Sequence, residues 1–210
     1  MNFFKTPPLL KFFYPDLIWD QKQEGGKQIY LTFDDGPIPK ITPYVLDVLA
    51  EYQAKATFFC VGDNIERHPE VYQQVLDAGH RTGNHTFNHL NGWKTDNEHY
   101  LQNIMYCRQS QERYTNDIGK PLFRPPYGKI TRSQIKILKN EYHIVMWDIL
   151  SGDYNPRFAA EKCLNKCIRH TVPGTIIIFH DSRKAAKNLK FVLPRYLDHF
   201  AQAGFQFSAL

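Results

Sequence analysis

The chain has 210 residues, enough for one domain with a sizeable core, and 42% hydrophobic and 14% aromatic residues exclude a disordered protein. It carries 26 basic and 21 acidic residues, which leave a net charge of +5. Because these charges form no dense run of lysine and arginine, the composition argues against nucleic acid as a partner.

Four cysteines, at positions 60, 107, 163 and 167, lack the paired spacing of a zinc site and occur in apolar or helical contexts. We expect free buried thiols, which slightly favour a reducing compartment. No stretch approaches the ~20 apolar residues of a membrane-spanning helix, and the first residues carry no clear export signal. The sequence therefore favours a cytoplasmic location over export.

Residues 1–26 are interpreted as an N-terminal extension and residues 27–210 as the main domain. Prolines at positions 7, 8 and 15 interrupt the apolar pattern of the extension. We expect the extension to pack on the main domain as a cap that closes the bottom of the fold, through Phe12, Phe13, Tyr14 and Trp19.

After residue 26, strand patterns alternate with helix patterns. Continuous apolar runs predict strands, and apolar residues at helical spacing predict helices. The predicted strands cover residues 29–33, 56–61, 80–84, 122–124, 143–147, 175–179 and 205–208. The predicted helices cover residues 42–52, 70–78, 98–114, 133–140, 159–170 and 189–203.

Repeated β-α units with continuously apolar strands predict a parallel sheet covered by helices. About seven or eight such strands predict an α/β fold, a distorted (β/α) barrel. Chemistry in such barrels lies at the C-terminal ends of the strands. Polar residues gather at the predicted strand ends, namely Asp34, Asp35, His85, Arg124, Asp153 and His180.

Two adjacent aspartates, Asp34 and Asp35, end the first predicted strand. Strand alternation points them in opposite directions, and like charges so close resist joint ionisation unless a cation or base lies nearby. A solvated Asp-Gly-Pro turn is the ordinary explanation of such a pair. The polar residues at the other strand ends favour a metal hydrolase instead.

His85 and His89 are spaced i, i+4, so that in a helical turn they would share one face and hold one ion. This spacing alone is common by chance in a protein with nine histidines. With Asp35 as a third ligand, the set suits Zn²⁺, and also Co²⁺, Ni²⁺ or Fe²⁺. A cation held in this way activates water and polarises a carbonyl group.

If Asp35 binds the cation, Asp34 is free to take a proton from water, and Arg124 could orient it. A structural salt bridge is the alternative role for Arg124. His180 follows a strand that is almost wholly aliphatic. Isolated histidines are usually satisfied core residues, but a protonated imidazole here could deliver a proton to a leaving amine or alcohol. Asp153 is the candidate partner of its second nitrogen.

Five segments together resemble, in order, the five motifs of the polysaccharide deacetylases, carbohydrate esterase family four with its NodB-homology domain. The segments are Thr32–Pro37, His85–His89, Arg124–Gly128, Trp147–Tyr154 and Ile177–Asp181. The resemblance covers the chain from about residue 28 onward and implies a NodB-like fold, with residues 27–210 as the catalytic domain. It also implies a base at Asp34, metal ligands at Asp35, His85 and His89, an orienting Arg124, and an acid at His180 tuned by Asp153.

By the same resemblance, the backbone N–H of Tyr127, in the turn that begins at Pro126, would help hold an oxyanion, and Ile178 would line the pocket for the acetyl methyl group. The fourth motif departs from the family pattern. Tyr154 stands where many members carry tryptophan, and Leu150 stands where they carry an acid. Tyr154 can still stack on a sugar ring, and Trp93 either lines the groove or serves packing.

The sequence thus predicts a metal-dependent hydrolase that removes acetyl groups from N-acetylated sugars of a polysaccharide or oligosaccharide. Hydrolysis of O-acetyl esters, as in xylan, or of a small amide on the same scaffold is the alternative within enzymes. A catalytically silent sugar-binding module is the alternative from another class. Because no catalytic residue of the family pattern is lost, the silent module is the weakest of the three.

Overall fold

The computed structural model describes residues 4–22, 26–114 and 119–210. The strands are β1 (Gln28–Asp34), β2 (Thr57–Cys60), β3 (Arg81–Asn84), β4 (Leu122–Phe123), β5 (His143–Ile144), β6 (Ile149–Leu150), β7 (Ile176–His180) and β8 (Gln206–Ser208). The helices are α1 (Pro8–Phe13), α2 (Thr42–Glu51), α3 (Gly62–Arg67), α4 (Pro69–Asp77), α5 (Asn97–Glu112), α6 (Arg132–Leu138), α7 (Ala160–His170) and α8 (Ala186–Gln202), with a short 3₁₀ turn η1 (Pro126–Gly128).

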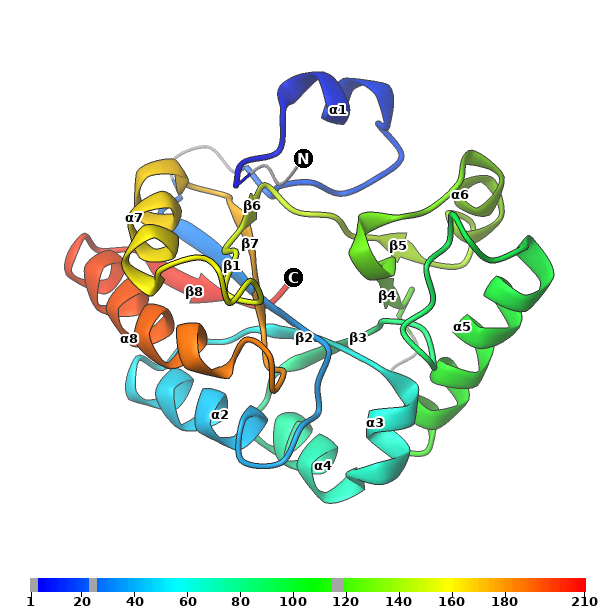
Figure 1. Ribbon diagram of the computed structural model, residues 1–210, viewed down its shortest axis with the longest axis horizontal. Coiled ribbons are helices and arrows are strands. Elements are labelled where there is room, and N and C mark those ends of the chain that lie inside the picture. The colour runs from blue at the N-terminus through cyan, green and yellow to red at the C-terminus, as the bar shows by residue number, and fades with distance from the viewer. Residues whose placement is uncertain (1–3, 23–25, 115–118) are drawn as a thin grey trace.

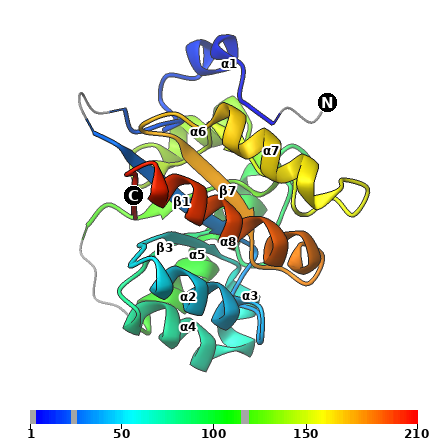
Figure 2. The same cartoon turned by 90° about the vertical axis from the view of Figure 1, so that its left-hand side faces the viewer.

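The strands form one parallel sheet that curls into a distorted (β/α) barrel, which confirms the predicted fold class. The order across the sheet is β5-β4-β3-β2-β1-β7-β6, and β8 pairs with the first half of β1. Figures 1 and 2 show the helices around the outside of the curled sheet. This arrangement buries both faces of the central strands, as their continuous apolar sequences require.

Strand β1 lies at the centre of the sheet and is buried over six of its seven residues. It is flanked by β2 and by β7, whose run of isoleucines is typical of a buried strand. The register places Asp34 opposite His180 on β7. Two polar side chains therefore leave the sheet at the same level, side by side.

The larger hydrophobic core lies between the sheet and helices α2, α4, α7 and α8, and it includes Cys60, Cys163 and Cys167. All four cysteines are free and buried, as predicted. A second core joins β4, β5, α5 and α6, and Leu17 and Trp19 of the N-terminal segment pack into it. Within the described ranges, no helix is both long and apolar enough to cross a bilayer.

The sheet is open between its two end strands, β5 and β6, and residues 4–22, here called the N-terminal segment, cross this open side. Ile18 bridges Val145 in parallel, and Lys5 bridges Ile149 in antiparallel fashion. The Lys11 ammonium, on α1, contacts the carboxylates of Asp148 at 2.6 Å and Asp20 at 2.7 Å. The segment thus contacts both edges of the open sheet.

The prediction that Phe12 and Phe13 pack in a cap is wrong, because 76% of Phe12 and 56% of Phe13 is exposed. The ion pairs of Lys11 give the reason, because they hold the face of α1 that carries Lys11 against the protein. Phe12 and Phe13 are left on the solvent side. Trp19 is buried and its indole N–H donates to the Tyr14 carbonyl. Figure 2 shows α1 standing away from the other helices.

Two elements differ from the sequence prediction for local reasons. The strand predicted over residues 143–147 stops at Ile144, because the next residues pair with the N-terminal segment, Met146 N–H donating to the Ile18 carbonyl at 2.7 Å. The chain rejoins the sheet at β6, which no apolar run predicts. Helix α3 was not predicted because Ile65 is its one large buried side chain, too little for a periodic pattern.

Candidate active site

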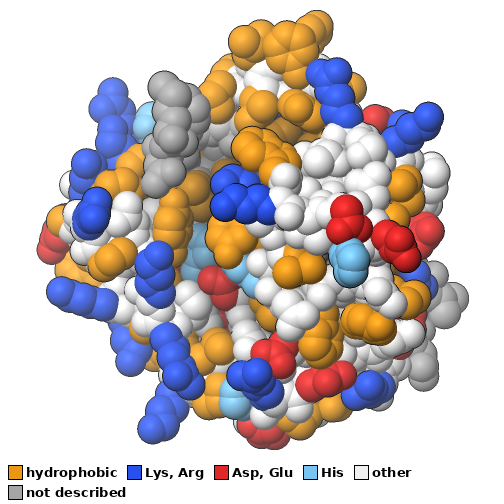
Figure 3. Space-filling view, turned by 45° about the vertical axis from the view of Figure 1, so that its right-hand side comes forward, with side chains coloured by type: hydrophobic (Ala, Val, Ile, Leu, Met, Phe, Trp, Pro, Cys, Tyr) orange, Lys and Arg blue, Asp and Glu red, His pale blue; other side chains and the backbone are white. Residues whose placement is uncertain are grey.

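A cavity of about 980 Å³ opens at the C-terminal ends of β1 and β7 and extends toward the N-terminal segment. In the space-filling view, histidine and acidic side chains lie at the base of a hollow bordered by apolar and basic side chains (Figure 3). Most of the polar residues predicted at the strand ends meet here, including Asp34, Asp35, His85 and His180.

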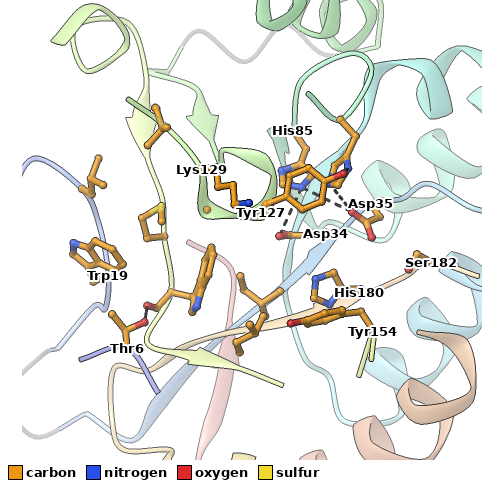
Figure 4. A pocket seen from close by; sticks show the side chains of 18 of the residues that line it. Thr6, Trp19, Asp34, Asp35, His85, Tyr127, Lys129, Tyr154, His180 and Ser182 are labelled. Atoms are coloured by element: carbon orange, nitrogen blue, oxygen red, sulfur yellow. Dashed lines mark hydrogen bonds and ion pairs between the residues drawn. The ribbon is translucent and has the colours of Figure 1, made fainter. Parts of the chain in front are cut away.

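Asp35, His85 and His89 form a candidate metal centre at one side of this cavity. The Asp35 Oδ1 atom lies 3.2 Å from His89 Nε2 and 3.9 Å from His85 Nε2. One ligand atom from each residue falls within 4.8 Å of the others. Figure 4 shows the Asp35 carboxylate directed toward the imidazole of His85. Two imidazoles and one carboxylate, with the remaining side open to the cavity, fit a tetrahedral cation with a free position.

The two histidines do not lie in a helical turn, so their i, i+4 spacing is not what brings them together. They belong to the loop that follows β3, where Thr86 and His89 adopt left-handed backbone conformations with φ of 62° and 55°. Side chains hold this loop in place, because the Asn84 amide oxygen accepts from Thr86 N–H and the Asn103 amide oxygen accepts from Phe87 N–H. The loop brings the imidazole centroids to 5.0 Å.

His85 is set to bind a cation through Nε2. Its Nδ1 lies 2.8 Å from the Arg124 carbonyl oxygen and donates to it, so the lone pair remains on Nε2. Burial lowers the pKa of His85 to about 4, so the ring is neutral near pH 7, as metal binding requires. The Nδ1 atom of His89 lies 3.0 Å from the Tyr127 hydroxyl, which orients the second ring.

Asp35 is held as an anion. Burial opposes ionisation, but the hydrogen bond with His89 and the charge of His180 hold the pKa of Asp35 well below its ordinary value. The Asn64 side chain donates to the Asp35 carbonyl oxygen at 2.7 Å and fixes the backbone, which is left-handed here with φ of 84°. The carboxylate is therefore available as a ligand.

Asp34 is 4% exposed and forms an ion pair with the fully buried Arg124. The guanidinium donates to Asp34 Oδ1 at 2.7 Å and to the Thr32 hydroxyl at 2.8 Å, and it lies 4.0 Å from the centre of the Phe59 ring. The second oxygen of Asp34 faces His85 Nε2 at 3.9 Å. One carboxylate oxygen is thus held while the other is directed at the candidate metal centre.

His180 and Asp153 form a second acid–base pair on the opposite wall. The Nδ1 atom of His180 lies 2.8 Å from Asp153 Oδ1, and the backbone N–H of His180 donates to Oδ2 at 2.9 Å. The Ser151 hydroxyl also donates to Asp153. Burial opposes protonation of the imidazole, but Asp153 raises the pKa of His180 to about 9. At neutral pH the ring is therefore an imidazolium whose Nε2 proton can be given away.

The remaining predicted residues occupy different depths of the pocket. Ile178 lies on its inner wall and is 1% exposed, and the Tyr154 ring packs edge-on against His180 at 4.9 Å between centroids. Tyr127 is 61% exposed at the mouth. Pro126 is buried at the start of η1 and does not line the cavity. Trp93 lines the mouth with 64% exposure while its indole N–H donates to the Ile130 carbonyl.

Backbone strain is concentrated at this site. Six non-glycine residues of the described ranges have positive φ, and four of them, Asp35, Thr86, His89 and Tyr127, belong to the loops around the candidate metal centre. Such conformations persist only where the surroundings enforce them, and they cluster at functional sites.

Sequence reasoning missed the part of the pocket built by the N-terminal segment, where Thr6, Leu10, Leu17 and Trp19 line the cavity. It also missed cationic side chains at the rim, Lys129, Arg183 and Lys184. No local pattern could have indicated them, because their position depends on how segments distant in the sequence pack together.

The fold and the site together define a hydrolase of the deacetylase class on a distorted (β/α) barrel. The sequence profile of the family described as polysaccharide deacetylase matches residues 21–143. A peptidoglycan-N-acetylglucosamine deacetylase of Bacillus cereus is 35% identical over 186 residues, which are 86% of this chain and 85% of that protein. A chitooligosaccharide deacetylase of Azorhizobium caulinodans is 34% identical over 160 residues, 75% of each chain.

Solved structures agree with these relatives. The Bc1960 peptidoglycan N-acetylglucosamine deacetylase, in complex with 4-naphthalen-1-yl-N-oxidanyl-benzamide, is similar with a TM-score of 0.88 and 27% identity, covering 98% of this chain and 95% of that chain. This chain belongs to the polysaccharide deacetylase family, carbohydrate esterase family four with NodB homology. The fold is also that of BA3943, a family pseudoenzyme of Bacillus anthracis, with a TM-score of 0.81 and 21% identity, so activity rests on the site and not on the fold.

Proposed function

We propose that this protein removes acetyl groups from N-acetylated amino sugars of a polysaccharide or oligosaccharide by cation-assisted hydrolysis of the amide. The observation that carries the proposal is the meeting of a metal-ligand set, a carboxylate and an imidazolium in one cavity. The relatives named for peptidoglycan and chitooligosaccharides support an N-acetylated glycan as the substrate class. We assign catalysis to residues 27–210, with residues 1–26 as an extension.

We propose Asp35, His85 and His89 as the ligands of a divalent cation. Zinc fits two imidazoles and one carboxylate best, and cobalt, nickel or iron suits the same donors. The contacts of the two Nδ1 atoms with the Arg124 carbonyl and the Tyr127 hydroxyl support this role, because metal-binding imidazoles commonly use their other nitrogen to bond a carbonyl or hydroxyl oxygen. When bound, such a cation polarises the carbonyl and makes water more acidic.

Asp34 takes the proton of the attacking water through the oxygen that Arg124 does not hold. Arg124 keeps the carboxylate in one orientation and balances its charge in a buried position. His180 gives its proton to the departing nitrogen as the C–N bond breaks, and Asp153 keeps the ring oriented and charged until that moment. The products are acetate and the free amino sugar.

We propose that the backbone N–H of Tyr127 donates a hydrogen bond to the carbonyl oxygen as it becomes negatively charged. Pro126, the first residue of η1, restrains the turn that carries this N–H. We assign Ile178 to the wall that meets the acetyl methyl group. Tyr154 and Trp93 offer aromatic faces at the pocket, which suit the apolar faces of a sugar ring. The cationic side chains at the rim add hydrogen-bond donors for sugar hydroxyls.

Acetate release from a panel of glycans tests this function. The panel contains N-acetylchitooligosaccharides, peptidoglycan fragments and acetylated xylan, each with native protein, EDTA-treated protein, and treated protein resupplied with zinc, cobalt, nickel or iron. We expect release from the N-acetylated glycans, loss after EDTA and recovery with metal. The His85→Ala variant should lose both bound metal and activity, whereas His99→Ala, an exposed histidine outside the site, should keep both.

Other outcomes point elsewhere. Release from xylan alone would indicate an O-acetyl esterase. Binding of oligosaccharide without turnover under any metal would indicate a silent module. Full activity after complete removal of metal would refute the proposed chemistry.

A further inference from the structure

The cavity has two chemically different halves. Toward the solvent its rim carries charged and hydroxyl side chains, including Lys129, Ser182 and Lys184. In the other direction, toward the N-terminal segment, the lining is mostly apolar and includes Ile178, Leu150, Trp147, Met146, Leu17 and Trp19. Figure 4 shows Thr6 and Trp19 across the pocket from Asp34, Asp35 and His180, with carbon-rich side chains between them.

The apolar half begins directly beside the reacting groups. Ile178 and His180 are two residues apart on β7, so their side chains share one face of the strand. Leu150 of β6 is the register partner of Ile178 and extends the same wall. Trp147 and Leu10 of α1 also line the cavity, and Leu10 is 41% exposed.

Two of the polar groups in this half are already engaged within the protein. The Thr6 hydroxyl donates to the Trp147 carbonyl at 2.7 Å, and the Trp19 indole N–H donates to the Tyr14 carbonyl at 3.0 Å. The hydroxyls of a sugar ring placed here would lose their hydrogen bonds to water. These two protein groups are not available to replace those bonds, so binding of the sugar would cost free energy. An aliphatic chain has no such requirement and gains from burial.

Because this half is mostly apolar and begins beside His180, it suits the acyl substituent of the scissile amide better than the hydroxyl-bearing sugar. We propose that the apolar half is an acyl channel, and that the substrates of this protein include amino sugars whose nitrogen carries an aliphatic acyl chain longer than acetyl, such as hexanoyl or octanoyl. The inference rests on the proposed function for its reaction. Water cleaves the same C–N bond, and the products are the free fatty acid and the free amino sugar.

A chain-length series tests the channel. Chitotetraose is re-acylated with acetyl, butanoyl, hexanoyl or octanoyl groups, and release of free amine gives kcat and KM for each. Burial of each further methylene improves affinity by about fourfold, so KM should fall with chain length. We expect kcat/KM for the octanoyl substrate to equal or exceed that for the acetyl substrate.

A matched pair of variants locates the effect. Leu10 lines the cavity from α1, whereas its neighbour Leu9 is 65% exposed and does not line it. The variant Leu10→Glu places a charge at the far end of the channel and should lower the octanoyl-to-acetyl ratio of kcat/KM at least tenfold. Leu9→Glu introduces the same charge one residue away and should leave the ratio unchanged. Both positions are exposed on a surface helix, so neither change threatens folding.

Binding of octanoate to the protein, followed by tryptophan fluorescence, gives a readout that needs no turnover, because Trp19 and Trp147 line the channel. Cleavage of the acetyl substrate without cleavage of the octanoyl substrate and without octanoate binding would overturn the channel and leave the proposed deacetylation intact. No cleavage of either substrate, with octanoate binding that Leu10→Glu weakens, would support the channel and count against the proposed function. Equal effects of the Leu9 and Leu10 variants would also overturn it.

Discussion

At the scale of single residues, the site separates two neighbouring carboxylates by giving them different partners. Asp35 faces two imidazoles, whereas Asp34 is bound on one oxygen by a buried guanidinium. The expected strand alternation does not separate them, because Asp35 follows the last residue of β1 with a left-handed backbone, φ of 84°. Each carboxylate has one oxygen 3.9 Å from His85 Nε2, and only their other partners differ. The difference in partners assigns the ligand role to one carboxylate and the proton-accepting role to the other.

The variant Asp34→Asn tests this division. The amide oxygen can still accept from Arg124, so the buried cation keeps a partner, but the group no longer accepts a proton. We expect kcat to fall by roughly 10²- to 10⁴-fold, while zinc content, measured by elemental analysis, stays at the native level. Turnover within tenfold of the native protein would contradict the role of Asp34.

The pair of His180 and Asp153 predicts a pH dependence. His180 acts in its protonated form, so activity is present below its pKa of about 9 and is lost as the pH rises through that value. Asp153 raises this pKa, so Asp153→Asn should move the alkaline limb of kcat/KM to lower pH. Asp96→Asn removes the carboxylate from an exposed His–Asp pair at 2.7 Å elsewhere and serves as the control. An unmoved alkaline limb in Asp153→Asn would exclude His180 as the acid.

At the scale of elements, the structure explains which parts of the site the sequence could predict. Residues at the ends of long apolar strands were predictable, because β1 and β7 are fixed by their own composition and a parallel sheet aligns their ends. The loop of His85 and His89 was not, since its left-handed residues are not glycines and carry no local signal. Strand β6 has two residues and is defined by its pairing with β7 and by the bridge from Lys5.

Helix α1 is held on the barrel by an ion-pair cluster, and this contact can be tested. Asp148 is 2% exposed and relies on Lys11 for charge balance. In Lys11→Met the buried carboxylate loses its closest cation, so we expect the free energy of unfolding to fall by about 1–3 kcal/mol. Urea unfolding measures the change. The control is Lys22→Met, which removes a 67% exposed lysine 4.0 Å from Asp20 and should lower the free energy of unfolding by less than about 0.5 kcal/mol. Equal losses of stability in the two variants would show that the ion pairs of Lys11 do not hold α1 on the barrel.

At the scale of the whole molecule, the candidate metal centre links three elements, because Asp35 follows β1, both histidines follow β3, and His85 is braced by the Arg124 carbonyl after β4. A ligand that binds only the folded state stabilises all of it by mass action. The sequence predicted the donors of this centre but not the second half of the cavity, which depends on the packing of the N-terminal segment against residues more than a hundred positions away.

Zinc should therefore raise the stability of the entire fold. At free zinc a hundredfold above the dissociation constant, we expect the free energy of unfolding to rise by about 2.7 kcal/mol, seen as a higher Tm in a thermal scan. EDTA should reverse the change. His89→Ala removes one donor and should abolish most of the increase, whereas His99→Ala should retain it. The same increase in both variants would place the ion somewhere else.

The bridges that close the open side of the sheet have a consequence for biosynthesis. Thr6 bonds to a carbonyl 141 positions along the chain, and Lys11 pairs with a carboxylate 137 positions away. During synthesis the N-terminal segment leaves the ribosome long before Trp147 and Asp148 are made. The segment therefore cannot form these contacts until most of the central strands have been synthesised. The open side of the sheet can therefore close only after residues 147 and 148 have been synthesised, and the reaction centre needs His180, which is synthesised later still.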